Sequence, residues 1–172
     1  MTGADTSWGI IGIGQLGTSL VEGIYQSKAP FSICLSPRGE SQVRALVARF
    51  PIVVATDNQS VVDSVDHVIL AVRPDQIADV ANALNFRSGQ VIVSAAAGVK
   101  HNSLQAVIEP AVAVRAMPVL SAAIADSPTS VYPANAVAVD LFEHLGPVQP
   151  STTKTLSPWP LSRRPTTAGC TR

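Results

Sequence analysis

A group of closely spaced glycines near the N-terminus constrains the fold of this chain more than any other feature. Gly12, Gly14 and Gly17 follow an apolar stretch, and apolar residues then recur at positions 16, 20, 21 and 24, as on one helix face. A strand, turn and helix in this order can hold the pyrophosphate of a dinucleotide, because the helix N-terminus favours an anion. We expect Gly12 to allow the tight turn, Gly14 to admit the pyrophosphate and Gly17 to let the helix pack closely. Three glycines can also mark an ordinary loop, so the motif needs its context.

The length and charge of the chain narrow its partners. Its 172 residues suffice for one domain with a substantial core, and 12 basic residues balance 12 acidic ones. This balance predicts no nucleic-acid partner and no anionic membrane surface, so we expect a small-molecule substrate. The N-terminus lacks a signal-peptide pattern, no apolar run reaches the roughly 18 residues of a membrane span, and two cysteines make no disulfide framework. We therefore expect a cytoplasmic protein.

Apolar runs alternate with helical patterns over most of the chain. After the first strand and helix, strands are expected at residues 31–36, 51–55, 67–72, 90–94 and 112–115, and helices at 40–50, 58–65, 75–84 and 103–108. Residues 130–132 could add a strand and residues 140–145 a closing helical turn, and Asn58 is a plausible N-cap. The alternation predicts an α/β fold: a Rossmann-like, doubly wound, mainly parallel sheet with helices on both faces.

Residues 7–148 make up this predicted domain. Residues 149–172 change character, because Pro, Ser, Thr and Arg dominate and no periodicity remains. We expect this stretch to be an irregular, disordered tail. We also expect it to be an out-of-frame or truncated end.

Ligands of doubly wound sheets bind beyond the carboxyl ends of the strands. The loops at residues 12–17, 36–38, 72–74 and 95–98 should therefore face one crevice. An NAD-selective fold carries a carboxylate about 20 residues past the glycines, but residues 34–38 contain none. Ser36 can donate to a ribose 2′-phosphate and Arg38 can pair with it, which favours NADP. The alternative is that these residues form only a solvated turn.

Taken together, the loops resemble the pyrroline-5-carboxylate reductase family. The resemblance covers residues 8–148 in one collinear register. It rests on these segments: Ile-Gly-Ile-Gly-Gln-Leu at 11–16, Ser-Pro at 36–37, Asp-Asn at 57–58, Ala-Val-Arg-Pro at 71–74, Val-Ser-Ala-Ala-Ala-Gly-Val at 93–99, Val-Arg-Ala-Met-Pro at 114–118 and, more faintly, Thr-Ser-Val-Tyr-Pro at 129–133.

The resemblance implies an oxidoreductase of proline biosynthesis that transfers a hydride from NADPH to 1-pyrroline-5-carboxylate and yields L-proline. With the crevice above, it gives the expected cofactor-binding residues: Ile11, Gly12, Ile13, Gly14, Gln15, Leu16, Gly17, Ser36, Arg38, Asn58, Ala71, Val72, Arg73, Pro74, Ala95, Ala96, Ala97 and Gly98. The family has Lys at the position of Arg73, and for this arginine a phosphate or ribose contact and a solvent-facing role both stay open. No catalytic residue is assigned, and the scattered histidines predict no metal site.

Two departures from the family pattern bear on activity. After Arg-Ala-Met-Pro the family continues Asn-Thr-Pro near the nicotinamide, whereas this sequence has Val119, Leu120 and Ser121. The family's C-terminal helical domain, which forms the dimer and carries substrate-site segments, has no counterpart in this sequence. A homo-oligomer nevertheless stays an open alternative. We expect weak or no activity from this chain alone. The alternatives are a non-catalytic nucleotide-binding module and another NADP reductase, such as an F420-linked NADP oxidoreductase.

Overall fold

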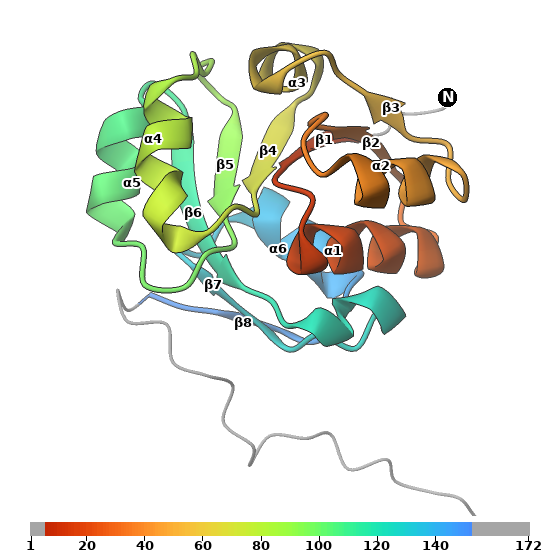
Figure 1. Cartoon of the computed structure of the whole chain (residues 1–172). Helices are drawn as coiled ribbons and strands as arrows, with labels where there is room; N and C mark the ends of the chain where they lie inside the picture. The colour runs from red at the N-terminus through yellow and green to blue at the C-terminus, as the bar shows by residue number, and fades with distance from the viewer. Residues whose placement is uncertain (1–5, 153–172) are drawn as a thin grey trace, which may run out of the picture.

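The computed structural model describes residues 6–152 and places eight strands in one sheet (Figure 1). The order across the sheet is β3-β2-β1-β4-β5-β6-β7-β8, and all neighbours pair in parallel except β6 and β7. The strands are β1 (Thr6–Ile11), β2 (Phe31–Leu35), β3 (Val53–Val54), β4 (His67–Leu70), β5 (Val91–Ser94), β6 (Val112–Met117), β7 (Thr129–Tyr132) and β8 (Val148–Pro150). The predicted Rossmann-like, mainly parallel sheet is confirmed.

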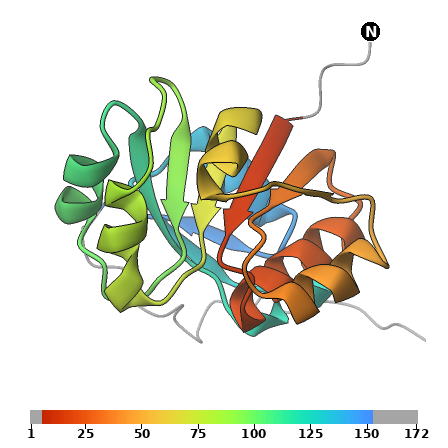
Figure 2. The ribbon, with the colours of Figure 1, turned by 45° about the horizontal axis from the view of Figure 1, so that its top comes forward.

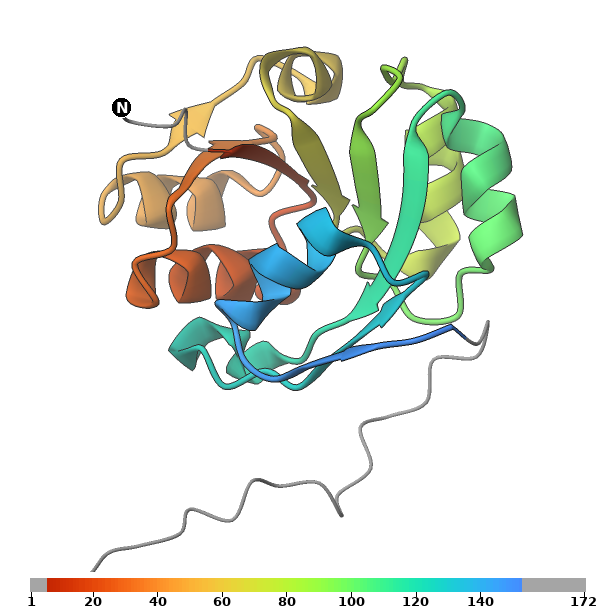
Figure 3. The same ribbon diagram turned by 180° about the vertical axis from the view of Figure 1, so that it is seen from behind.

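Helices cover both faces of the sheet, as predicted. They are α1 (Gln15–Gln26), α2 (Glu40–Val47), α3 (Asn58–Ser64), α4 (Ile77–Asn82), α5 (His101–Ile108) and α6 (Ala136–Glu143), with 3₁₀ turns η1 (Pro74–Gln76) and η2 (Leu120–Ile124). One core layer joins the sheet to α1, α2, η2 and α6, and the other joins it to α3, α4 and α5. Figure 3 shows α6 on the same face as α1. The central strands are apolar and buried on both faces, which is typical of parallel sheets.

Three details differ from the sequence prediction. Asp57, not Asn58, caps α3, because its carboxylate accepts a hydrogen bond of 2.7 Å from the Ser60 N–H. The strand expected at residues 130–132 is confirmed as β7, which runs antiparallel to β6. Helix α6 begins four residues before the helical turn expected at 140–145, and β8 follows it. Strand β8 carries the sheet two residues beyond the expected domain end at 148, and the Ser151 N–H donates to the Val131 carbonyl. The rest of the expected tail, from 153 onward, lies outside the described residues.

Candidate functional site

The glycine turn joins β1 to α1 beside the end of β4 (Figure 2). Gly12 adopts φ +99°, and a Cβ on it would lie 2.7 Å from a Val72 methyl and 2.8 Å from the Ala71 backbone. A Cβ on Gly17 would lie 2.4 Å from the Gly12 carbonyl oxygen. These two positions therefore need glycine for conformation and for packing.

Gly14 differs from its two neighbours in the motif. It is the N-cap of α1, its φ is −92°, and a Cβ there would have no protein atom within 4 Å. Neither backbone strain nor packing in the protein therefore requires glycine here. The open space adjoins the first turn of α1, whose N–H groups have no partners within the helix and which carries no acidic side chain. This arrangement fits a phosphate approaching the backbone.

Ser36 ties the second strand to the glycine turn. Its residue is fully buried, and its hydroxyl oxygen accepts a hydrogen bond of 3.2 Å from the Gly12 N–H. Its own N–H donates to the Ile10 carbonyl. The sequence prediction gave this hydroxyl to a ribose phosphate. In the structure this hydroxyl supports the glycine turn through its contact with Gly12, and Ser36 also belongs to the lining of the cleft described next. A role toward a ribose phosphate stays a prediction.

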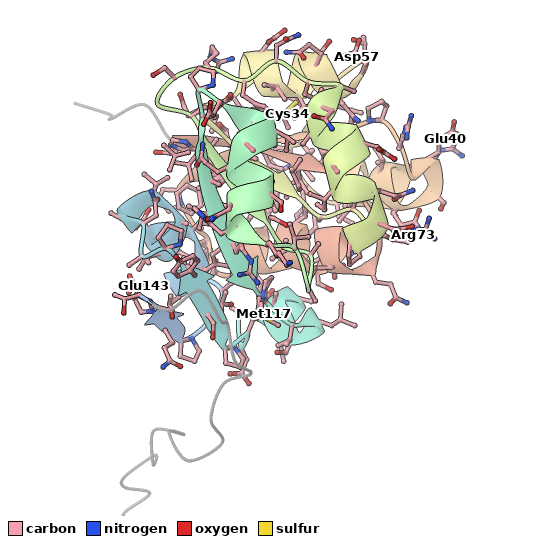
Figure 4. All side chains as sticks on the ribbon, turned by 90° about the vertical axis from the view of Figure 1, so that its left-hand side faces the viewer. Cys34, Glu40, Asp57, Arg73, Met117 and Glu143 are labelled. Carbon is pink, nitrogen blue, oxygen red and sulfur yellow. The ribbon has the colours of Figure 1, made fainter. Side chains whose placement is uncertain are left out.

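A cleft of about 520 Å³ opens over the glycine turn, between the carboxyl ends of β1, β2 and β4. Ten of the predicted cofactor-binding residues line it: Ile11, Gly12, Ile13, Gly14, Ser36, Arg38, Asn58, Ala71, Val72 and Arg73. Arg73 lies at the surface, where Figure 4 labels it, and pairs with Asp75 at 3.4 Å. The structure therefore brings together most of the loops predicted to face one crevice.

A second recess, of about 580 Å³, continues from this cleft and is called the outer recess below. Four residues line both spaces: Arg38, Asn58, Asp79 and Val80. The outer recess is otherwise bounded by Pro37, the segment 56–59 and the residues 83 and 84 that follow α4. Hydrogen bonds from the Ser60 N–H and hydroxyl lower the pKa of Asp57 in this wall, so the carboxylate stays ionised at neutral pH. The cleft and the outer recess therefore adjoin through the residues that they share.

The remaining predicted residues lie outside the cleft lining. Gln15 and Leu16 belong to the first turn of α1, and Gly17 is buried behind it. Ala95 and Ala96 are buried at the end of β5. Pro74, Ala97 and Gly98 line a separate cavity of about 370 Å³ between α4 and α5. The turn at 95–98 thus shares the carboxyl edge of the sheet but not the cleft itself.

Four lining residues were missed by the sequence analysis. Gly39 has φ +87°, and a Cβ on it would lie 2.7 Å from the Ile13 carbonyl, so it brings the start of α2 against the glycine turn. Gln76, Asp79 and Val80 face the cleft from η1 and α4. Asp79 and Val80 follow Gln76 by three and four residues, so the three side chains lie on one side of a helix. This spacing could have identified them from the sequence, because a helix is expected after Pro74.

The segment after β6 presents apolar side chains where the family has polar ones. Val119 and Leu120 are 46% and 54% exposed, and Ile124 in the same turn is 69% exposed. The Val119 N–H donates to the Ser127 hydroxyl at 2.9 Å, which fixes the backbone of this segment. Valine and leucine side chains cannot make the hydrogen bonds of asparagine and threonine, and neither residue lines the cleft or the recess described above.

Within residues 6–152, no three His, Cys, Asp or Glu side chains are placed to hold a metal ion. No helix of the described chain is long and apolar enough to cross a membrane. Arg115, within β6, is buried, and this burial lowers the pKa of its guanidinium.

Comparison with known proteins assigns this architecture to a family. A family model described as NADP oxidoreductase, coenzyme F420-dependent, matches residues 7–98, which is more than half of the 172 residues. The chain belongs to this family of NADP-binding oxidoreductase domains. The matched residues include the glycine turn, Arg38 and the lining part of α4. This description names the F420-linked NADP oxidoreductase, which the sequence analysis gives as an alternative. The family model alone therefore does not distinguish among the reductases that share this domain.

Individual relatives point to one type within the family. A pyrroline-5-carboxylate reductase of Methanosarcina acetivorans is 32% identical over 139 residues, which are 77% of this chain and 52% of the relative. The structure of 1-pyrroline-5-carboxylate reductase from Streptococcus pyogenes is 26% identical with a TM-score of 0.72, over 85% of this chain and 58% of that one. The chain is thus a pyrroline-5-carboxylate reductase-like, NADP-binding N-terminal domain, as the resemblance predicted.

A further solved structure shows the same fold. The pyrroline carboxylate reductase of Plasmodium falciparum, solved with NADP bound, is 18% identical with a TM-score of 0.74, over 86% of this chain and 58% of that one. The present chain spans about half the length of the curated relatives it matches.

Proposed function

We propose that this chain binds NADPH in the cleft over the glycine turn and serves the reduction of 1-pyrroline-5-carboxylate to L-proline. NADPH, when bound, supplies the hydride for such a reduction. The chain's own contribution is placement: the first turn of α1 receives the pyrophosphate, and Arg38 faces the ribose 2′-phosphate. The relatives named above support the substrate assignment. A small-molecule substrate also agrees with the balanced charge of the chain.

One observation carries the nucleotide part of this proposal. Of the three glycines in the turn, Gly14 is the one that neither backbone conformation nor packing requires, because a Cβ there would meet open space. An aspartate at Gly14 would be a favoured N-cap and would stabilise α1. The same carboxylate would stand where the pyrophosphate is proposed to lie. Stability and binding should therefore respond in opposite directions at this position.

The experiment compares Gly14→Asp with the control Ser88→Asp. The control adds the same charge at an exposed position in the loop before β5, at the opposite ends of the strands from the cleft. Fluorescence titration with NADPH should show binding to the unmodified chain and to Ser88→Asp, and a loss of at least about tenfold in Gly14→Asp. Thermal unfolding should show Gly14→Asp as stable as the unmodified chain or slightly more so. Equal NADPH affinity in all three proteins would refute the placement.

Activity is tested by adding 1-pyrroline-5-carboxylate to the NADPH complex and following the loss of nicotinamide absorbance. Oxidation supports the reductase assignment for this chain. Binding without oxidation supports a second candidate, a nucleotide-binding module without catalysis. The apolar, exposed Val119 and Leu120 favour that second candidate, because hydride transfer requires the reacting atoms to be held about 3–3.5 Å apart.

A further inference from the structure

The passage between the cleft and the outer recess carries two opposite charges. Of the four residues that line both spaces, Arg38 and Asp79 are the charged ones, and Asn58 and Val80 are neutral. Arg38 comes from the loop after β2, and Asp79 comes from α4. Both residues are exposed. A ligand that extends from the glycine turn into the outer recess must pass these two side chains.

Neither charge is engaged by the protein. Among residues 6–152, the ion pairs are Arg49 with Glu22 and Arg73 with Asp75, and neither Arg38 nor Asp79 takes part in an ion pair or a side-chain hydrogen bond. Arg38 and Asp79 therefore do not neutralise each other, although they line the same passage. Both charges stay available to act on whatever occupies it.

The two charges act in opposite directions on the ribose 2′ position. With the pyrophosphate on the first turn of α1, the adenosine half of a dinucleotide extends through the passage. A 2′-phosphate is attracted by Arg38 and repelled by Asp79, whereas a 2′-hydroxyl can donate a hydrogen bond to the Asp79 carboxylate. The carboxylate thus weakens the binding of NADP and favours that of NAD.

We infer that Asp79 is a specificity-determining residue that reduces the preference of this site for NADP over NAD. The inference rests on the proposed nucleotide function of the cleft. The sequence analysis predicts the nucleotide preference from Ser36 and Arg38 after β2, and Asp79 is a further determinant. It also places that determinant on a helix after β4 instead of at the end of β2.

The test uses Asp79→Asn, which removes the charge and keeps the size, with Asp140→Asn as control. Asp140 is exposed on α6, on the other face of the sheet. Affinities for NADPH and NADH are measured by fluorescence titration, and those for adenosine 2′,5′-bisphosphate and AMP by calorimetry. Asp79→Asn should bind NADPH and the bisphosphate about three- to tenfold more tightly at low salt, with no gain for NADH or AMP. The gain should shrink at high salt, and Asp140→Asn should match the unmodified chain.

The outcomes separate this inference from the proposed function. If the unmodified chain binds NADPH but Asp79→Asn changes NADPH and NADH equally, or neither, the inference is refuted and the proposed function stands. If the unmodified chain binds neither dinucleotide, both are refuted. A gain in Asp140→Asn equal to that in Asp79→Asn would assign the effect to net charge and would also refute the inference.

Discussion

The two ends of the central strands treat their polar groups in opposite ways. At the carboxyl ends, the first-turn N–H groups of α1 have no partners within the helix, and the charges of Arg38 and Asp79 are unpaired by other described residues. At the amino ends, polar groups bond to one another. The Ser7 N–H and hydroxyl both donate to the Asp66 carboxylate, at 2.8 and 2.6 Å.

Loop residues close the amino end further. Arg87 donates to the carbonyls of Val62 and Val65 at the end of α3, at 2.8 and 2.6 Å, and the buried Gln90 side chain donates to the same two carbonyls. The Val91 N–H donates to Nδ1 of His67 at 3.1 Å. At the amino ends of the strands, called the amino edge below, the polar groups thus bond within the protein. At the carboxyl ends, N–H donors and charged side chains stay available for a ligand. Substitutions at the two edges should separate stability from binding.

The largest effect is expected where both roles coincide, at Gly12. Gly12→Val forces a β-branched residue to φ +99° and drives its Cβ into Val72 and the Ala71 backbone. We expect a loss of about 2–6 kcal/mol in unfolding free energy, together with loss of NADPH binding. Urea unfolding monitored by circular dichroism measures the first effect. Near-native stability would show that the turn has another conformation open to it.

Arg38→Asp should change binding without changing stability. The substitution removes the attraction for a 2′-phosphate and adds repulsion, so NADPH affinity should fall about ten- to a hundredfold, and NADH affinity much less. Unfolding free energy should change by no more than about 0.5 kcal/mol, because the side chain is exposed. An equal loss for NADPH and NADH in fluorescence titrations would contradict the 2′-phosphate role.

Arg87→Met should do the reverse at the amino edge. It removes hydrogen bonds to carbonyls at the end of α3, which should cost about 1–3 kcal/mol in unfolding free energy, while NADPH affinity stays the same. Arg49→Met serves as control, because its pair with Glu22 lies at the surface and contributes at most about 1 kcal/mol. A drop in NADPH affinity for Arg87→Met would break the separation between the two edges.

The smallest effect concerns the pH dependence of the amino edge. Burial lowers the pKa of His67 below its usual 6.5, and its Nδ1 must stay unprotonated to accept the Val91 N–H. Above pH 6.5 the ring is neutral in both states. As the pH falls below 6.5, the unfolded chain takes up the proton first, so stability falls until the lower folded pKa is reached. His67→Gln should flatten this limb by about a few tenths of a kcal/mol, measured by urea unfolding between pH 5 and 7.5.

Much of the fold was predictable because it depends on local pattern. The apolar runs of β4 and β5 and the glycines of the β1–α1 turn determine backbone conformation within a few residues. The predicted roles of Gly12 and Gly17 match the contacts that a Cβ would make at each. Even the NADP-binding family was readable, since its segments occur in one order along residues 8–148.

What the sequence did not predict concerns helix capping and contacts between distant segments. The contact between the Gly12 N–H and the Ser36 hydroxyl joins residues 24 positions apart. Asn58 and Asp57 are both acceptable caps, and the backbone turn before α3 selected Asp57. The reversal into β7 depends on pairing with β6 from the far side, which no local pattern encodes.

By itself, the sequence determined which segments become strands and helices and where a phosphate turn forms, because these depend on periodicity and on glycine's tolerance of positive φ. Only the tertiary structure decided which side chains share a space. It kept the 95–98 turn out of the cleft lining and joined the Ser36 hydroxyl to the glycine turn. It also placed Asp79 and Arg38, which are 41 positions apart, in the lining of the same passage, because α4 and the β2–α2 loop pack against the same strand ends.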